Sequence, residues 1–140
     1  MQLPLDTDEL DTVDRLSLVA MASLYLVAGV AHFLAPEPFE RIVPPWLPRP
    51  RALVYVSGAA EVAVGLGVLH PRTRRASAVG LALLLAAVFP ANVYMAAGDP
   101  DLGLPGTVGE PSDAALWGRL PLQAALVVWA LRYARDDEEE

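Results

Sequence analysis

The chain has 140 residues, which fits a single domain, and 54 % of them are hydrophobic. A net charge of −7 and the lack of a basic stripe in the sequence argue against a nucleic-acid-binding protein. Cysteine is absent, which excludes disulfides, thiol catalysis, cysteine metal sites and iron–sulfur clusters. Two long stretches without Asp, Glu, Lys or Arg, Leu16–Pro36 and Ala76–Gly98, predict membrane-spanning helices.

Four apolar segments follow one another between two acidic tails, residues 1–14 and 135–140. A span of about 20 residues crosses the roughly 30 Å hydrocarbon layer as a helix, and each segment is long enough for that. Residues 15–134 therefore form one predicted membrane domain. Its predicted spans are about Leu16–Leu34, Ala52–Leu69, Ala76–Ala97 and Asp113–Tyr133.

Prolines and glycines mark the connections between these spans. Six prolines between Pro36 and Pro50 forbid a continuous helix from the first span to the second. His70-Pro71 ends the second span, and Ser112 is a predicted N-cap for the fourth. We expect an all-α fold, an antiparallel four-helix transmembrane bundle with a proline-rich outer loop after its first helix.

The arginines predict the orientation of this bundle, because positive charges accumulate in cytoplasmic loops. With the N-terminus inside, six arginines lie on the inner side and three on the outer side. We therefore expect a multi-pass protein of the plasma membrane with both termini in the cytoplasm. The inner arginines are Arg15, Arg72, Arg74, Arg75, Arg132 and Arg135, and the outer ones are Arg41, Arg49 and Arg51.

Polar residues inside the spans gather in the outer half or the middle of the predicted bundle. Glu61 is about nine residues from the start of its span, roughly 13 Å deep. All four spans contribute, and we expect the side chains to converge on one cavity with Glu61 as its deepest charge. The candidate ligand or proton-site residues are His32, Glu61, Asn92, Arg119 and Gln123.

Glu61 is the sharpest of these candidates, because a charged side chain at a helix centre costs about 2.5–3.5 kcal/mol to insert. It should face the bundle interior, where Gly58 and Gly65 leave room for a neighbouring helix or a ligand. One interpretation is a buried pair with Arg119 or His32 that only fixes helix register. The other is a ligand or proton site; no metal site is expected from two histidines on opposite sides.

The outer loop combines apolar residues, prolines and charges. Such a segment could lie along the membrane interface, with Trp46 as an aromatic anchor, or fold inward over the cavity. The residues that would cover the cavity are Phe39, Pro44, Pro45 and Trp46.

Several strings in this order resemble the DoxX family of small integral membrane proteins. They are Tyr25–Phe33, Pro36–Phe39, Ile42–Pro48, Ser57–Glu61, Gly65–Gly67, Pro71–Arg74 and Phe89–Asn92, and they cover roughly Leu16–Ala97. The resemblance implies a four-helix membrane protein, and it matches His32 and Glu61 to the family's embedded polar positions. Some members are similar to subunits of quinone-linked oxidoreductases.

Two classes of function remain open at this stage. The first is a non-enzymatic membrane module, that is, a subunit, an assembly factor or a binder of lipid or quinone. The second is a membrane subunit of a quinone-linked oxidoreductase, with Glu61 and His32 handling protons and a membrane or soluble redox partner. A small-solute transporter is a third interpretation; four short spans would have to form a homo-oligomer to make a path.

Overall fold

The computed structural model describes residues 10–104 and 109–135, and within them the fold is all-helical, with five helices and no strand. Apart from residues 10–14 and Arg135, the acidic tails lie outside the described residues. The helices are α1 (Thr12–Leu34), α2 (Pro36–Arg41), α3 (Pro50–Gly67), α4 (Pro71–Ala97) and α5 (Asp113–Arg132).

Side-chain caps fix the starts of α1 and α5. The Asp11 carboxylate accepts a hydrogen bond from the Asp14 backbone N–H at 2.8 Å, and the Ser112 hydroxyl accepts one from the Ala115 N–H at 3.2 Å. Each cap satisfies a backbone donor that the first helical turn leaves without a partner. The predicted N-cap at Ser112 is therefore confirmed.

The helix α4 begins five residues before the third predicted span. Pro71 occupies the first helical turn, where its missing N–H costs nothing, and the His70 ring accepts a hydrogen bond from the Arg72 N–H. Arg74 turns back and donates to the Val68 and Leu69 carbonyls at the end of α3. Residues 71–75, which lie between the second and third predicted spans, therefore belong to the start of α4.

The proline-rich connection after α1 contains a helix of its own, α2. Pro36 stands in its first turn, where a fixed φ angle favours a helix start. The Arg51 guanidinium donates two hydrogen bonds to the Glu40 carboxylate, at 2.9 and 3.1 Å, and so ties α2 to the start of α3.

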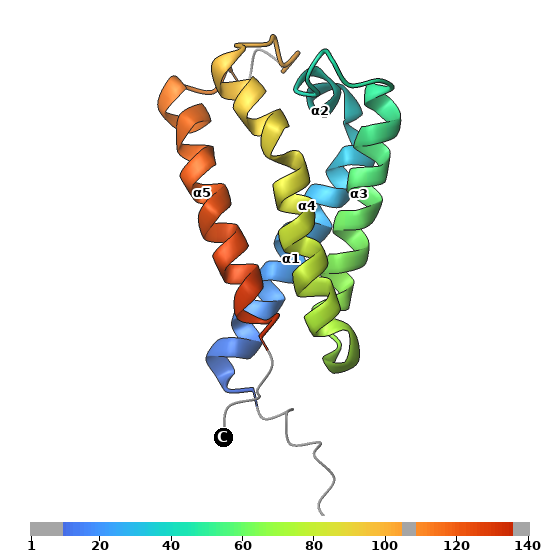
Figure 1. Cartoon of the computed structure of the whole chain (residues 1–140), viewed down its shortest axis with the longest axis vertical. Helices are drawn as coiled ribbons and strands as arrows, with labels where there is room; N and C mark the ends of the chain where they lie inside the picture. The colour runs from blue at the N-terminus through green and yellow to red at the C-terminus, as the bar shows by residue number, and fades with distance from the viewer. Residues whose placement is uncertain (1–9, 105–108, 136–140) are drawn as a thin grey trace, which may run out of the picture.

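The four long helices reverse direction from one to the next (Figure 1). Helix α1 packs on α3, α4 packs on α5, and α3 also contacts α4. The short α2 lies at one end, beside α1 and α3. We call this the α2 end, and the end where α1 begins and α5 finishes the opposite end.

Two apolar clusters hold the helices together. The larger one includes Met21, Leu81 and Val68, all fully buried, and joins α1, α4 and α5 with the residue that follows α3. The smaller one lies where α4 ends and α5 begins. Its buried members are Met95, Leu102 and Leu116, and Ile42 from the segment after α2 packs against them.

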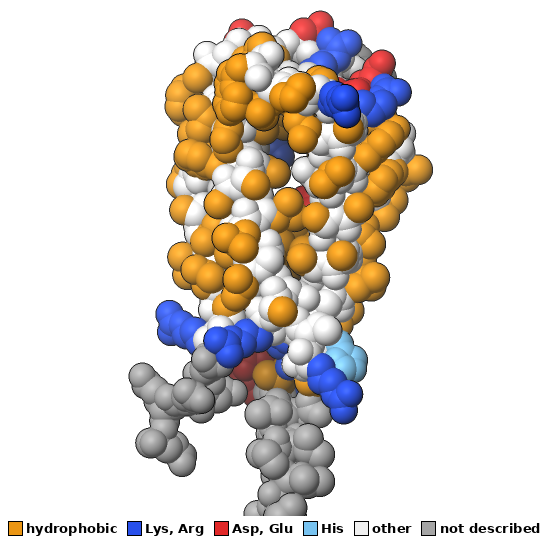
Figure 2. Space-filling model, turned by 45° about the vertical axis from the view of Figure 1, so that its right-hand side comes forward, with side chains coloured by type: hydrophobic (Ala, Val, Ile, Leu, Met, Phe, Trp, Pro, Cys, Tyr) orange, Lys and Arg blue, Asp and Glu red, His pale blue; other side chains and the backbone are white. Residues whose placement is uncertain are grey.

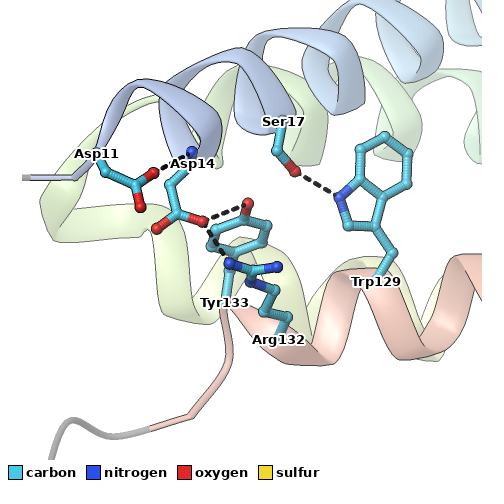
Figure 3. A network of polar contacts seen from close by, with 6 residues as sticks. All are labelled: Asp11, Asp14, Ser17, Trp129, Arg132 and Tyr133. Carbon is cyan, nitrogen blue, oxygen red and sulfur yellow. Dashed lines mark hydrogen bonds and ion pairs between the residues drawn. The ribbon is translucent and has the colours of Figure 1, made fainter.

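Polar contacts join α1 to α5 at the opposite end (Figure 3). Trp129 Nε1 donates to the Ser17 hydroxyl at 2.8 Å, and Arg132 forms an ion pair with Asp14 at 2.7 Å. Tyr133 also donates to Asp14, at 3.5 Å. Together with the larger apolar cluster, these contacts close this end of the molecule.

Three of the described helices, α1, α4 and α5, are long and apolar enough to cross a membrane. Only 28 %, 17 % and 17 % of their most apolar stretches, in that order, are buried inside the structure. Figure 2 shows the result, a flank covered by hydrophobic side chains with arginine side chains near both ends. The composition and this surface are consistent with a membrane protein.

Candidate functional site

Helices α1 and α3 approach each other closely along a seam of small residues. A Cβ atom added at Gly58 would lie 2.6 Å from the Cβ of His32 and 2.9 Å from the Gly29 carbonyl oxygen. One added at Gly29 would lie 2.8 Å from the Gly58 carbonyl oxygen and 3.1 Å from the Cβ of Glu61. Only glycine fits at both positions, and the two glycines set the distance between His32 and Glu61.

His32, in the last turn of α1, faces Glu61 from the middle of α3. Its Nδ1 lies 2.6 Å from the Ala28 carbonyl oxygen and 3.2 Å from Glu61 Oε2. The short contact assigns the Nδ1 proton to the Ala28 carbonyl. Glu61 Oε2 is buried and has no hydrogen-bond partner among the described residues.

Tyr25 belongs to the same seam, although the sequence analysis did not select it. It lies two turns before His32 on the same face of α1, is 4 % exposed, and interacts electrostatically with Glu61. Its hydroxyl is buried without a hydrogen-bond partner in the described part of the chain. The position of Tyr25, seven residues before His32 on the same helix, is the sequence signal that could have identified it.

Asn92 and Gln123 form a second seam, between α4 and α5. Asn92 Nδ2 donates to Gln123 Oε1 at 2.5 Å, and Gln123 Nε2 donates to the Leu85 carbonyl oxygen. The contacts lie close to the prolines inside the two helices, Pro90 and Pro121. Buried amide groups that satisfy one another hold two interrupted helices in register.

Arg119 lies one turn before Gln123 in α5, and its side chain is exposed. Its Nη1 is 3.8 Å from the Met95 sulfur, a weak acceptor. Within residues 10–104 and 109–135, no ion pair joins Arg119 to Glu61. Of the two pairs that the sequence left open for Glu61, the structure contains the one with His32.

The five candidate residues thus form two groups, one on each pair of helices, and no contact between the groups is present in the described residues. Figure 2 shows a hollow in the flank near the α2 end, between the helices, with basic and acidic side-chain atoms visible inside. Glu61 lies in the middle of α3, and Arg119 lies in the second turn of α5.

The segment after α1 lies across the α2 end of both groups. The Phe39 ring stacks on His32, with centroids 3.9 Å apart and an angle of 21°. Arg41 reaches the connection between α4 and α5, where it donates to the Asp101 carbonyl at 3.1 Å. Of the other residues selected as a cover, Pro44 is buried, Pro45 is exposed and Trp46 is 72 % exposed.

Two further observations concern a cavity near the site and the residues that could bind a metal ion. A cavity of about 310 Å³ lies at the α2 end, bordered by Met95, Leu102 and Leu116 and by exposed acidic residues. Among the residues that the structure describes, no three His, Asp or Glu side chains lie close enough together to hold a metal ion.

Comparison with known proteins identifies a family for most of the chain. The model of the family described as "Domain of unknown function (DUF8561)" matches residues 21–134. No curated protein and no solved structure matches the chain. The matched residues include all four long helices from Met21 onward, both polar seams and the segment that contains α2. The chain therefore belongs to the family described as Domain of unknown function (DUF8561).

Proposed function

We propose that the chain is an integral membrane protein, folded as an antiparallel four-helix transmembrane bundle with a proline-rich outer segment. The exposed apolar side chains support this proposal, for example Val27 at 71 %, Leu34 at 80 % and Val128 at 69 %. Exposed to water, such a surface would be unfavourable by about 25 cal/mol per Å². Helix α3 adds a further span to α1, α4 and α5, because it hides its one central charge, Glu61, against α1.

The proposed location is the plasma membrane, with both chain termini in the cytoplasm. The distribution of arginines supports this orientation, because Arg72, Arg74 and Arg75 lie together at the start of α4. The α2 end is then the outer end. We further propose that the chain is a DoxX-like membrane protein, which the strings around His32 and Glu61 support.

Within this membrane frame we propose a non-enzymatic module that binds a lipophilic molecule, a lipid or a quinone, in a polar site around Glu61. The observation that carries the proposal is Glu61 Oε2, a buried oxygen without a hydrogen-bond partner among the described residues. A buried carboxylate that only fixed helix register would have its oxygens satisfied, since an unsatisfied buried polar group costs about 1–3 kcal/mol. A bound head group supplies the missing partner.

The membrane subunit of a quinone-linked oxidoreductase remains the second candidate. The contact of 3.2 Å between His32 Nδ1 and Glu61 Oε2 favours it, because this pair could pass a proton to or from a bound quinone. That candidate requires a membrane or soluble redox partner. The two candidates share one site and differ in whether the bound molecule changes its redox state.

Mass spectrometry of the lipids that accompany the purified protein tests the proposal. We expect one lipophilic species, in an amount close to that of the protein, in the unchanged chain and in the Glu37→Gln control. Glu37 is an exposed acid of α2. Glu61→Leu, which removes both carboxylate oxygens, should lose this species.

Equal amounts of every lipid in all three proteins would contradict a site at Glu61. If the species is a quinone, its reduction by a donor protein in the same membranes would favour the oxidoreductase subunit. A quinone that stays oxidised with every donor would instead favour the non-enzymatic binding module.

A further inference from the structure

Both ends of the space between the two helix pairs are covered. At the α2 end, Phe39 covers His32, and Ile42 packs into the apolar cluster of Met95, Leu102 and Leu116. At the opposite end, the larger apolar cluster and the contacts of Figure 3 join α1 to α5. A molecule dissolved in water on either side therefore meets packed side chains before it reaches Glu61.

The flank between α3 and α4 differs from the two covered ends, because part of it is hollowed. Their halves near the opposite end touch, since a Cβ at Gly80 would lie 3.4 Å from a methyl group of Val64. Toward the α2 end, α4 leans away from α3 (Figure 1), and the space-filling view is hollowed there (Figure 2). Pro90 lies in this half of α4, and proline bends a helix by removing one backbone hydrogen bond.

The polar atoms without partners define what kind of head group fits. Tyr25, 96 % buried, offers a hydroxyl that can donate and accept, and Glu61 Oε2 accepts or, when protonated, donates. A ligand that satisfies both needs donors and acceptors on one head. Because side chains of both charges are visible inside the hollow (Figure 2), a head with a net charge would be attracted by one kind and repelled by the other.

We propose that the site takes an uncharged amphiphile with a hydroxyl-bearing head, which enters from the lipid phase through the flank between α3 and α4 and hydrogen-bonds to Tyr25 and Glu61. This inference rests on the proposed function and names the ligand class of that same site. The head lies beside α1 and α3 on the side of the bundle interior, and the chain extends through the hollow into the bilayer. Tyr25 is thus a binding residue of the site.

Binding of matched probes to the purified chain in lipid nanodiscs tests the inference. The probes are labelled hexadecane-1,2-diol and 1,2-dimethoxyhexadecane, which has the same chain and the same oxygens but no O–H donor. We expect the diol to bind at least tenfold more tightly than the diether, because losing the donors leaves the buried acceptor unsatisfied. Glycerol, the water-soluble head alone, should not displace the diol.

The variant Tyr25→Phe removes one oxygen, and Tyr55→Phe is its control, because Tyr55 is exposed on α3 and stacks on Phe33. Tyr25→Phe should lose about tenfold in affinity for the diol, whereas Tyr55→Phe should bind like the unchanged chain. Equal affinities for diol and diether in the unchanged chain would overturn the inference, even if Tyr25→Phe failed to fold.

The outcomes separate this inference from the proposed function. The protein could carry a lipophilic species that depends on Glu61 and yet show no preference for the diol over the diether. This outcome would support the binding module and reject the hydroxyl head. If no lipophilic species depends on Glu61, both the binding module and the hydroxyl head are rejected. If neither the diol nor the diether binds, water is the partner of the two oxygens, and the hydroxyl head is rejected as well.

Discussion

Two glycines allow α1 and α3 to approach closely enough for His32 to reach Glu61. In the sequence, Gly58 and Gly65 share a face with Glu61, which left room for a neighbouring helix or a ligand. In the structure α1 fills that room, with Gly29 against Gly58 and the Ala22 carbonyl near Gly65. Any ligand must therefore approach Glu61 from the bundle interior rather than along the seam.

We expect Gly58→Ala to lower the stability of the protein by about 1–3 kcal/mol, because the added methyl group would overlap His32 and the Gly29 carbonyl. Gly118→Ala is the matched control on α5, since a Cβ there meets nothing within 4 Å. That control should leave stability unchanged or raise it by less than about 1 kcal/mol. Thermal unfolding in detergent measures both, and equal unfolding temperatures would contradict the close packing.

The pairing of Glu40 with Arg51 gives a pH-dependent contact outside the spans. The hydrogen bond from Arg51 holds the pKa of Glu40 below its ordinary value. A lowered pKa in the folded protein means that the contact stabilises the attachment of α2 above the ordinary carboxyl pKa and is lost as pH falls through the lowered value. NMR titration of the Glu40 carboxyl carbon should show a higher midpoint in Arg51→Gln, and an unchanged midpoint would reject the pairing.

The residue types and their depth in the spans were enough to select His32, Glu61, Asn92 and Gln123 as embedded polar groups. The sequence limited the partner of Glu61 to Arg119 or His32 without deciding between them, and it did not predict that Asn92 pairs with Gln123, because a pairing depends on how each helix is rotated about its axis. Tyr25 escaped selection for a related reason. A tyrosine in an apolar span is ordinary, and only the burial of its hydroxyl without a partner distinguishes it.

At the scale of helices, α4 and α5 form a pair that depends on two amides. Both helices contain a proline, Pro90 and Pro121, and each proline removes a backbone hydrogen bond. Gln123 and Asn92 each lie two residues after one of these prolines, and Gln123 also contacts the Leu85 carbonyl. Hydrogen bonds between helices therefore offset the lost bonds within them.

A double-mutant cycle tests this pairing. Gln123→Leu and Asn92→Leu should each reduce stability, and the double variant should lose less than the sum of the two. The expected coupling is about 0.6–1.7 kcal/mol, the range found for hydrogen bonds between membrane helices. Additive effects would show that the two amides act independently.

The helices themselves were largely readable from hydropathy, and their ends were less so. The sequence places the second span at Ala52–Leu69, and α3 covers Pro50–Gly67. α4 starts at Pro71 rather than Ala76, because capping by His70 and proline at the first turn extend a helix beyond its apolar part. α2 was missed since six residues rich in proline carry no hydrophobic periodicity.

At the scale of the whole molecule, the apolar surface and the arginines support the proposed placement in a bilayer. The four proposed crossings put both chain termini on one side. With that side in the cytoplasm, six arginines lie inside against three outside, and the α2 end with its cover over His32 faces outward. The opening between α3 and α4 then lies in the outer leaflet.

Because the chain has no cysteine, single introduced thiols report this orientation without background. We expect an impermeant maleimide to label Glu110→Cys in intact cells and to label Asp137→Cys only after the cells are lysed. Both substitutions leave every arginine in place, so they do not alter the charge pattern that orients the protein. Labelling of Asp137→Cys in intact cells would place the termini outside. The cover at Phe39 would then face the cytoplasm, and the ligand would enter from the inner leaflet.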